Sequence, residues 1–187
     1  GGRSGRSQKA TREKTSVDDA EVHRMGSLGE VPDLLDVSRC FVKASALPSA
    51  GEGLFARTQI PAGCVCAFYS GVRLSHKLVD TRDWKENDNT ISIGSRVIDV
   101  PKPFHHLSHY SASLGHKTNH SGDPEKRNAE YSPYFHPRFG QIKCVRALRN
   151  IQAGEEILVD YGYSHTDEEG KTDLPDWYLQ EEKKNEN

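Results

Sequence analysis

The stretch GHKTNHSG at residues 115–122 places two histidines, a lysine and an asparagine within eight positions. Histidine pairs bind metals, but no third ligand accompanies this pair at a suitable spacing. Asn119, His120 and Ser121 match the N-glycosylation sequon, yet nothing else in the sequence indicates secretion. No helix start suited to phosphate follows. One role stays open at this point for Asn119 and His120, because both side chains are well suited to satisfy buried backbone groups.

Tyrosines form a second chemical feature. Tyr161 and Tyr163 end one apolar segment, Tyr69 ends another, and Tyr131 and Tyr134 lie in a third. Aromatic side chains on strands are usually part of the core. Phenols gathered at strand ends would also form an aromatic-walled slot with hydroxyls at its base. Such a slot suits a lysine side chain, which has an apolar stem and a head that needs hydrogen-bond acceptors.

Two further motifs match known site patterns but lack the required context. SAGEGLFA at residues 49–56 contains G-x-G-x-x-A, yet Pro61 and Gly63 follow too soon for the helix that a dinucleotide site needs. The motif can still bring backbone close to some ligand. HHLSH at residues 105–109 has His106 where a metalloprotease helix carries glutamate. We expect these histidines to be solvated or structural.

The cysteines favour no metal site. None forms a CxxC pair, and no second pair completes a zinc quartet. We expect buried free thiols at Cys40, Cys64, Cys66 and Cys144.

The bulk composition of the 187 residues indicates one lean domain with a tail: 34% of residues are hydrophobic and the mean hydropathy is −0.75. A net charge of −2 gives no basic excess for nucleic-acid binding, whereas an acidic groove for a basic peptide is compatible with it. No signal peptide or membrane-length apolar run is present, so we expect a soluble chain from a reducing compartment. Because it begins at Gly1 and its one methionine is Met25, we expect a processed chain or a fragment.

The elements that position these residues are mostly strands. Residues 1–29 are polar and rich in glycine and serine, and we expect a flexible leader or linker there. Short runs with strand composition, separated by turn residues, predict a mostly β (α+β) domain. These runs cover residues 39–45, 53–58, 64–72, 89–94, 96–100, 131–137, 141–149 and 155–163. One helix is predicted at residues 173–185, with Asp173 as its cap.

In order and spacing, these motifs resemble the SET-domain protein lysine methyltransferases. The motifs are SAGEGLF, FYSGVR, VDTRDW, VIDVP, ASLGHKTNHS, HPRFGQIKC and YGYSH, with a late Trp-Tyr at 177 and 178. They most resemble the histone H3 lysine-4 monomethyltransferase type, in which MORN repeats precede the SET domain. The resemblance spans about residues 31–182. It implies a SET domain at residues 30–165, with small curved sheets and a pseudoknot, and a helical C-terminal segment at 166–187 without zinc.

The resemblance also implies S-adenosylmethionine as cofactor, with S-adenosylhomocysteine as product and no metal. By residue-by-residue carry-over, the backbone of one loop runs along the cofactor, the central stretch contacts it and the C-terminal helix covers it. The implied cofactor residues are Ala50, Gly51, Glu52, Asn89, His116, Lys117, Asn119, His120, Trp177 and Glu181. The implied lysine channel, which carries the catalysis, consists of Tyr69, Tyr131, Tyr161 and Tyr163. The implied peptide-framing residues are Asp80, Thr90, Ser92 and Lys143.

Methyl transfer to an amine is an in-line displacement that needs no covalent enzyme intermediate. The enzyme must align nitrogen and methyl at about 3–3.5 Å. It must also supply a neutral amine, which a dry aromatic channel beside a sulfonium charge favours. The Tyr161 hydroxyl and the carbonyls of Asp88 and His116 would orient the methyl group by weak CH···O contacts. Phenols at Tyr69 and Tyr131 would fill the space of a second methyl, so monomethylation is expected.

Two departures from the family pattern bear on this reading. The family motif N-H-S-x-x-P-N is longer here, with extra residues between Ser121 and Asn128, and Asp88 stands where the close relative type has glycine. The leading hypothesis is a lysine monomethyltransferase for a basic peptide such as a histone H3 tail, and also for non-histone proteins. The alternative is a catalytically silent SET domain that binds peptide or cofactor, and a metal hydrolase comes third. We expect a nuclear, chromatin-associated monomer, with the cytoplasm as second location, and no direct nucleic-acid or membrane partner.

Overall fold

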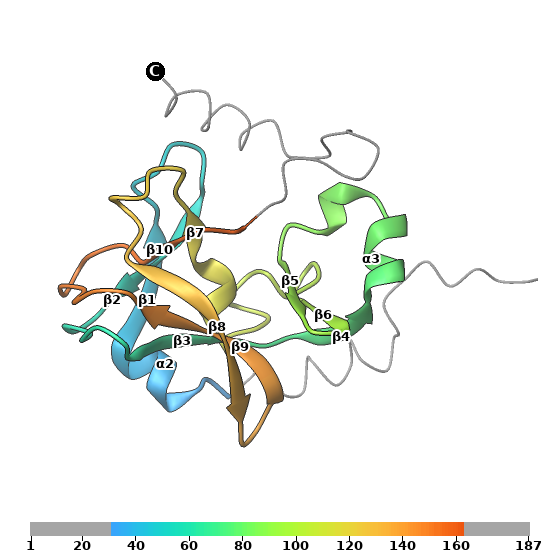
Figure 1. The fold of residues 1–187 in the computed structure, drawn as a ribbon, viewed down its shortest axis with the longest axis horizontal. Helices are drawn as coiled ribbons and strands as arrows, with labels where there is room; N and C mark the ends of the chain where they lie inside the picture. Colours follow the sequence, from blue (N-terminus) through green and yellow to red (C-terminus); the bar gives the residue numbers. More distant parts are fainter. Residues whose placement is uncertain (1–30, 163–187) are drawn as a thin grey trace, which may run out of the picture.

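The computed structural model describes residues 31–162, which form several small β-sheets with few and short helices (Figure 1). The sheets have the strand orders β1-β2, β3-β9-β8, β4-β6-β5 and β10-β7. In chain order the helices are α2 (Leu34–Arg39), α3 (His76–Thr81), η1 (Trp84–Glu86) and η2 (Gly115–Lys117). The strands are β1 (Cys40–Ala44), β2 (Glu52–Ala56), β3 (Val65–Tyr69), β4 (Val72–Ser75), β5 (Thr90–Ile93), β6 (Arg96–Asp99), β7 (Asn119–His120), β8 (Ala129–His136), β9 (Gly140–Ala147) and β10 (Leu158–Val159).

The central sheet has β9 between β3 and β8, and both pairings are antiparallel. Its strands contribute buried residues to two adjoining hydrophobic clusters. One cluster includes Leu54, Val145 and Ile157, and the other includes Phe68 and Ile98. Burial of these aliphatic and aromatic side chains is the main force that holds such small sheets together. The two clusters meet at Tyr131, which packs against both.

Most strands lie where the sequence predicts them, with three exceptions. Strand β7 was not predicted, the strand expected at 155–163 is limited to the two residues of β10, and one expected strand is divided in two. The segment 64–72, expected as one strand, is divided into β3 and the start of β4. At the break, the amide of Ser70 donates to the hydroxyl oxygen of Ser113 at 3.0 Å. This bond replaces a sheet partner, so the chain changes direction and β4 enters a different sheet. Cys64 lies just before β3 and is half-buried, whereas the other cysteines are buried.

Two helices that the sequence analysis did not predict flank the sheets. Each has only six residues, which is too short for a helical hydrophobic period to be visible. Helix α2 begins after Asp33, whose side chain accepts from the amide of Leu35. Within α2, the buried Asp36 carboxylate accepts from the backbone amides of Phe68 and Leu114 at 3.0 and 2.8 Å. The carboxylate therefore joins α2 to β3 and to the segment before η2.

The end of the described chain is threaded through the fold. Strand β10 pairs in parallel with β7, although the two are far apart in sequence. The amide of Ser121 donates to the carbonyl of Val159 at 3.0 Å on one side of the threaded segment. On the other side, the amide of Asn128 donates to the carbonyl of Leu158, also at 3.0 Å. The Asn128 side chain also donates to the carbonyl of Glu156 and accepts from the amide of Leu158. The loop from residue 121 to 128 thus crosses the segment that leads to Tyr161.

Some expectations concern residues outside this range. The polar leader at 1–29 and the helix at 173–185 are not among the described residues, so they stay predictions. Within residues 31–162, no helix has the length and apolar character needed to cross a membrane.

Candidate active site

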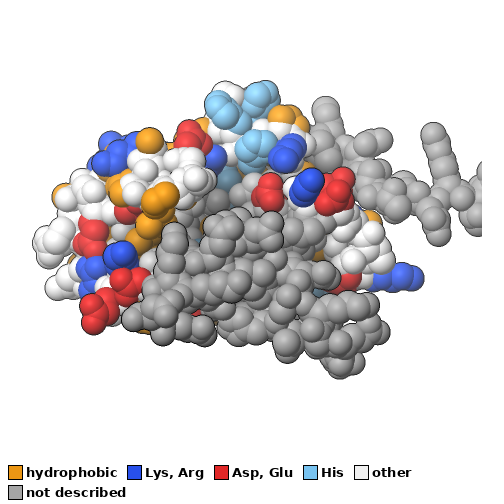
Figure 2. All heavy atoms as spheres, turned by 90° about the horizontal axis from the view of Figure 1, so that it is seen from above, with side chains coloured by type: hydrophobic (Ala, Val, Ile, Leu, Met, Phe, Trp, Pro, Cys, Tyr) orange, Lys and Arg blue, Asp and Glu red, His pale blue; other side chains and the backbone are white. Residues whose placement is uncertain are grey.

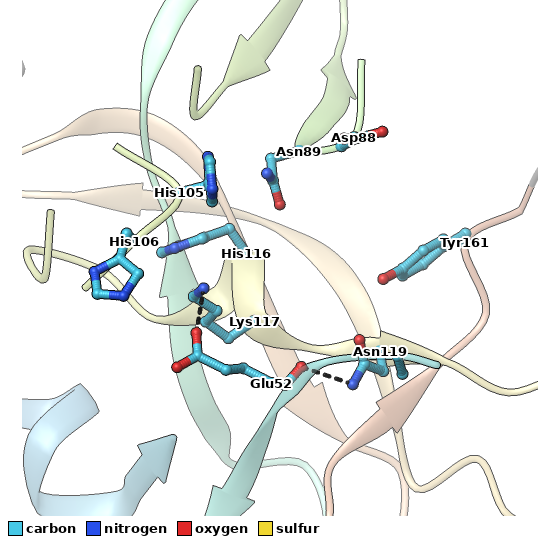
Figure 3. A pocket seen from close by; sticks show the side chains of 10 residues that line it. Glu52, Asp88, Asn89, His105, His106, His116, Lys117, Asn119 and Tyr161 are labelled. Carbon is cyan, nitrogen blue, oxygen red and sulfur yellow. Dashed lines mark hydrogen bonds and ion pairs between the residues drawn. The ribbon is translucent and has the colours of Figure 1, made fainter. Parts of the chain in front are cut away.

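A cavity of about 420 Å³ opens between the η2 turn, the start of β2 and the segment before β5 (Figure 3). Its walls contain charged, amide and imidazole side chains with a single tyrosine. The lining residues are Ala50, Glu52, Asp88, Asn89, His105, His106, His116, Lys117, Asn119 and Tyr161. A polar site of this size suits a small polar ligand.

The Lys117–Glu52 pair forms one wall of the cavity. The Lys117 ammonium lies 2.8 Å from the Glu52 carboxylate, and the Lys117 side chain is 11% exposed. This hydrogen bond holds the pKa of Glu52 below its ordinary value. The Asn119 side chain donates to the backbone carbonyl of Glu52 at 3.0 Å, which joins β7 to β2 (Figure 3). The elements that carry the SAGEGLF and ASLGHKTNHS motifs are therefore connected at the cavity.

Glu156 also supports this wall of the cavity, although the sequence motifs did not predict a role for it. Its carboxylate accepts from the Ser45 hydroxyl at 2.6 Å, from the Ala46 amide at 3.0 Å and from the Asn119 side chain at 3.2 Å. A Cβ atom at Gly53 would lie 2.2 Å from the same carboxylate, so a larger residue there would push Glu156 away from these hydrogen-bond donors. The paired glutamates before β10 were visible in the sequence, but nothing local showed that one of them accepts from Ser45 and Asn119.

Histidines line the cavity beside the Lys117–Glu52 pair (Figure 3). His105 and His106 line it, and Figure 2 shows histidine side chains gathered on this face beside basic and acidic groups. Burial, together with the charge of Lys117, holds the pKa of His105 below its ordinary value. Burial first, then the Lys117 charge, lowers the pKa of His116 to about 3. The His116 ring is therefore neutral at physiological pH.

The three expected catalytic tyrosines lie together beside the cavity. Tyr69 ends β3 and meets Tyr131 of β8 edge to face, with ring centroids 5.9 Å apart; Tyr131 stacks on Tyr161 at 6.5 Å. Tyr69 also meets the His116 ring at 6.3 Å. Tyr69 belongs to one hydrophobic cluster, Tyr161 packs against the other and Tyr131 packs against both. The tyrosine cluster, meaning Tyr69, Tyr131 and Tyr161, therefore lies where the two clusters meet.

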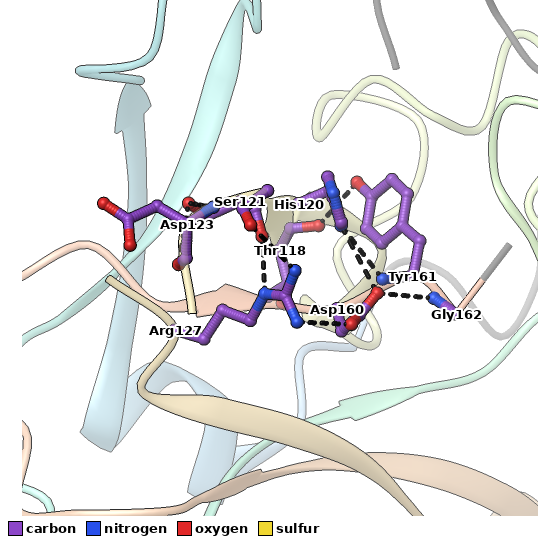
Figure 4. Close-up of polar contacts among 9 residues, drawn as sticks. Thr118, His120, Ser121, Asp123, Arg127, Asp160, Tyr161 and Gly162 are labelled. Atoms are coloured by element: carbon purple, nitrogen blue, oxygen red, sulfur yellow. Dashed lines mark hydrogen bonds and ion pairs between the residues drawn. The ribbon is translucent and has the colours of Figure 1, made fainter. Parts of the chain in front are cut away.

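Tyr161 belongs to both regions, since it also lines the cavity. Its hydroxyl donates to the Thr118 carbonyl at 2.9 Å, and its amide donates to Nδ1 of His120 at 3.1 Å (Figure 4). His120 is buried behind Tyr161, with ring centroids 5.3 Å apart, and does not line the cavity. His120 therefore lies where it orients Tyr161, through this hydrogen bond and the ring contact.

The other predicted site residues do not line the cavity or lie outside the described residues. Gly51, with φ of +70°, lies between the lining residues Ala50 and Glu52 but does not itself line the cavity. Thr90 and Ser92 lie two apart on β5, one of the two outer strands of its sheet, and β5 lies against β9, which carries Lys143. Asp80 is exposed on α3, away from the cavity lining. The remaining predictions, Tyr163, Trp177 and Glu181, lie outside the described residues.

Two other kinds of chemistry find little support. Across the described part of the chain, no group of three metal-ligating side chains comes together. Burial raises the pKa of the Cys66 thiol to about 12 and keeps the pKa values of Cys40 and Cys144 above the usual thiol range. A thiol held protonated in this way is a poor nucleophile.

The chain matches the family model described as the SET domain over residues 51–162. The histone-lysine N-methyltransferase SETD7 of Halocynthia roretzi is 42% identical over 165 residues, which cover 87% of this chain. The chain belongs to the SET-domain family. This membership confirms the predicted family and the mostly β fold. The chain spans 42% of the length of that relative, so the relative contains a large part with no counterpart here.

Solved structures agree with the SET fold. An active polycomb repressive complex 2 in the basal state matches with a TM-score of 0.52 and 24% identity, over 71% of this chain and 16% of the matched chain. The Chaetomium thermophilum polycomb repressive complex 2 matches with a TM-score of 0.51 and 22% identity, over 66% and 16% of the two chains. At this level of identity the similarity concerns the fold.

Proposed function

We propose that this SET domain is a protein-lysine N-methyltransferase that transfers one methyl group from S-adenosylmethionine to a lysine of a basic peptide. The supporting observation is Tyr161, which lines the polar cavity and also belongs to the tyrosine cluster. A reaction between two ligands needs such a shared boundary, because the reacting atoms must be held close together and in line.

The cavity residues fit the charged and polar groups of the cofactor. Glu52 and Lys117 offer one charge of each sign, and Asn89 and Asn119 offer amide groups. Trp177 and Glu181, predicted from the resemblance, would cover the site. When bound, S-adenosylmethionine supplies a methyl group on a positively charged sulfur. The chain's own residues then have to admit a neutral amine, exclude water and hold the amine in line.

The tyrosine cluster fits the second task. Its rings come from β3, β8 and the segment after β10, and they would surround the apolar stem of a lysine. A dry aromatic environment disfavours the ammonium form, so it favours the neutral amine. A neutral amine held by the tyrosine cluster would displace the methyl group from the cofactor's sulfur, which would keep the electron pair of the broken bond, and the methylated amine would lose a proton once it leaves the channel for solvent. Tyr69 and Tyr131 would limit the space for a second methyl.

The peptide would approach β5, where Thr90 and Ser92 lie, with Asp80 and Lys143 to either side. Asp80 gives this side a negative charge that suits a basic peptide. By family resemblance we propose a histone H3 tail, at lysine 4, as substrate, with non-histone proteins as further substrates. A nuclear, monomeric enzyme is part of the same proposal.

A methylation assay tests this function. The 187-residue chain is incubated with labelled S-adenosylmethionine and an array of lysine peptides that includes the H3 tail, and products are read by mass spectrometry. We expect one methyl per modified lysine. Cofactor binding by calorimetry without transfer to any peptide would instead indicate a silent binding module.

Product specificity has its own matched pair of variants. Tyr131→Phe should admit dimethylation, because loss of the hydroxyl opens space beside the amine. Tyr134→Phe is the control: it is on the same strand, but its ring contacts Phe68 at 4.9 Å and not the tyrosine cluster. An unchanged product pattern in Tyr131→Phe would contradict the channel assignment.

A further inference from the structure

The loop from Ser121 to Asn128 is longer than the family motif and lies across the segment that carries Tyr161. Its middle is a turn of its own: the Glu125 amide donates to the Asp123 side chain at 3.0 Å, and Lys126 pairs with Asp123 at 3.6 Å. Its two ends hydrogen-bond to the backbone of β10, as described above. The added length therefore lies close to the tyrosine cluster and not at a remote surface.

Arg127 connects this loop to the chain after β10 (Figure 4). Its Nε donates to the Ser121 carbonyl at 2.6 Å and one terminal nitrogen donates to the Gly122 carbonyl at 3.0 Å. The other terminal nitrogen donates to the Asp160 carboxylate at 2.5 Å. The guanidinium is planar and offers donors in a fixed geometry, so it can serve all three acceptors at once.

Asp160 extends the connection to both sides of Tyr161. One carboxylate oxygen binds Arg127, and the other accepts from the Gly162 amide at 2.9 Å. That second oxygen also lies 3.8 Å from Nδ1 of His120, the atom that accepts from the Tyr161 amide. The carboxylate therefore holds the backbone after Tyr161 through the Gly162 amide, His120 holds the Tyr161 amide, and Arg127 holds the carboxylate.

We propose that Arg127 and Asp160 are a pair of positioning residues that set the orientation of Tyr161 toward the cavity. The proposal rests on the proposed methyltransferase function for its kinetic consequence. Neither residue itself lines the cavity, so both act through Tyr161 and Gly162. The Arg127 side chain is 23% exposed and that of Asp160 46%, and an ion pair this exposed contributes little to folding. Its effect should therefore be seen in the geometry of the site and in the rate.

The central experiment compares the same substitution at two neighbouring positions. Arg127→Gln removes the positive charge and the guanidinium donors that bind three acceptors. Lys126→Gln removes an exposed lysine whose partner, Asp123, lies within the turn. We expect Arg127→Gln to lower kcat about tenfold, because small misplacement of a reacting group is costly in rate. KM for peptide and cofactor should stay within about twofold and the melting temperature within about 2 °C, as for an exposed ion pair. Lys126→Gln should behave like the unaltered chain.

A double-mutant cycle separates positioning by the pair from two unrelated effects. Asp160→Asn removes the charge but keeps an oxygen for the Gly162 amide, and it tests the pair even if Arg127→Gln folds poorly. If the pair acts as a unit, the double variant is no slower than the slower single variant. Effects on kcat that multiply, or equal kcat in Arg127→Gln and Lys126→Gln, would overturn the proposal.

Amide hydrogen exchange gives a readout that does not require turnover. The amides of Tyr161 and Gly162 donate to His120 and Asp160, so they should exchange faster in Arg127→Gln and at the native rate in Lys126→Gln. If the unaltered chain transfers no methyl group, the proposed function fails, and the exchange result still decides whether the pair orders this segment. Unchanged exchange at both amides would refute the proposal by itself.

Discussion

The polar cavity and the tyrosine cluster share Tyr161 but differ in how they are built. The cavity gathers charged and amide side chains from loops and strand ends, with Lys117 and Glu52 compensating each other at 2.8 Å. The tyrosine cluster is made of aromatic rings at the junction of two hydrophobic clusters, with Tyr69 only 4% exposed. The cavity suits a charged, hydrated ligand that must be held. The tyrosine cluster suits a group that must lose its charge before it reacts.

This difference predicts that substitutions in the two regions change different measurements. Changes in the cavity should alter cofactor affinity, and changes in the tyrosine cluster should alter the chemical step or the product. Tyr161 lies in both regions and His116 contacts both, so these two residues test the division most directly.

The largest effect is expected for Tyr161→Phe. The variant keeps the ring but loses the hydroxyl that donates to the Thr118 carbonyl, so the ring loses its orientation at the shared boundary. We expect single-turnover rates to fall about 10²-fold, a typical result of misaligned reacting groups. Cofactor affinity by calorimetry should be nearly unchanged. A loss of cofactor affinity with an unchanged rate would break the proposed division.

His116 gives the next largest effect, on stability. Its folded pKa of about 3 lies below the ordinary value of 6.5, so below pH 6.5 the unfolded chain binds more protons than the folded chain. Stability from the neutral ring is thus complete above about pH 6.5 and is lost as the pH falls toward 3. Between pH 7 and pH 5 the loss is about 2 kcal/mol. Urea unfolding at both pH values should show the stability difference between the unaltered chain and His116→Asn shrink by about this amount.

Asp36 also makes the stability of the chain depend on pH, with the opposite sign, and the comparison with His116→Asn cancels this contribution. Burial raises the pKa of Asp36 to about 8, so Asp36 contributes stability that falls as the pH rises from its ordinary value toward 8. Both proteins contain Asp36, so its contribution cancels in the difference. A difference that does not change with pH would show that the His116 ring is not buried as described.

The smallest effect is expected for Asn119→Ala. The substitution removes the donor to the Glu52 carbonyl and to Glu156, which loosens the wall of the cavity. We expect cofactor affinity to fall about tenfold, equivalent to about 1.4 kcal/mol, with the number of methyl groups per lysine unchanged. Asn150→Ala is the matched control, since Asn150 accepts from the Ala62 amide away from the cavity. Equal affinities in the two variants would remove Asn119 from the site.

Local patterns were sufficient for most of the strands, and the ordered motifs carried the resemblance to the family. Alternating and β-branched runs predicted β1, β2, β5, β6, β8 and β9 close to their observed bounds. The short helices α2 and α3 were missed because six residues show no helical period. The parallel pairing of β7 with β10 could not be predicted from local sequence patterns either, because nothing near residue 120 in the sequence indicates a partner near residue 158. That threading was expected through the family resemblance alone.

The sequence by itself determined which residue types are available and in what order: the family motifs, the tyrosines and the polar GHKTNHSG stretch. The tertiary structure decided which of them meet. It placed Glu156 under Asn119, His120 behind Tyr161, and Arg127 beside Asp160. These contacts join residues that are 33 to 41 positions apart in the chain. Long-range contacts of this kind depend on loop closure and burial, which no local pattern encodes.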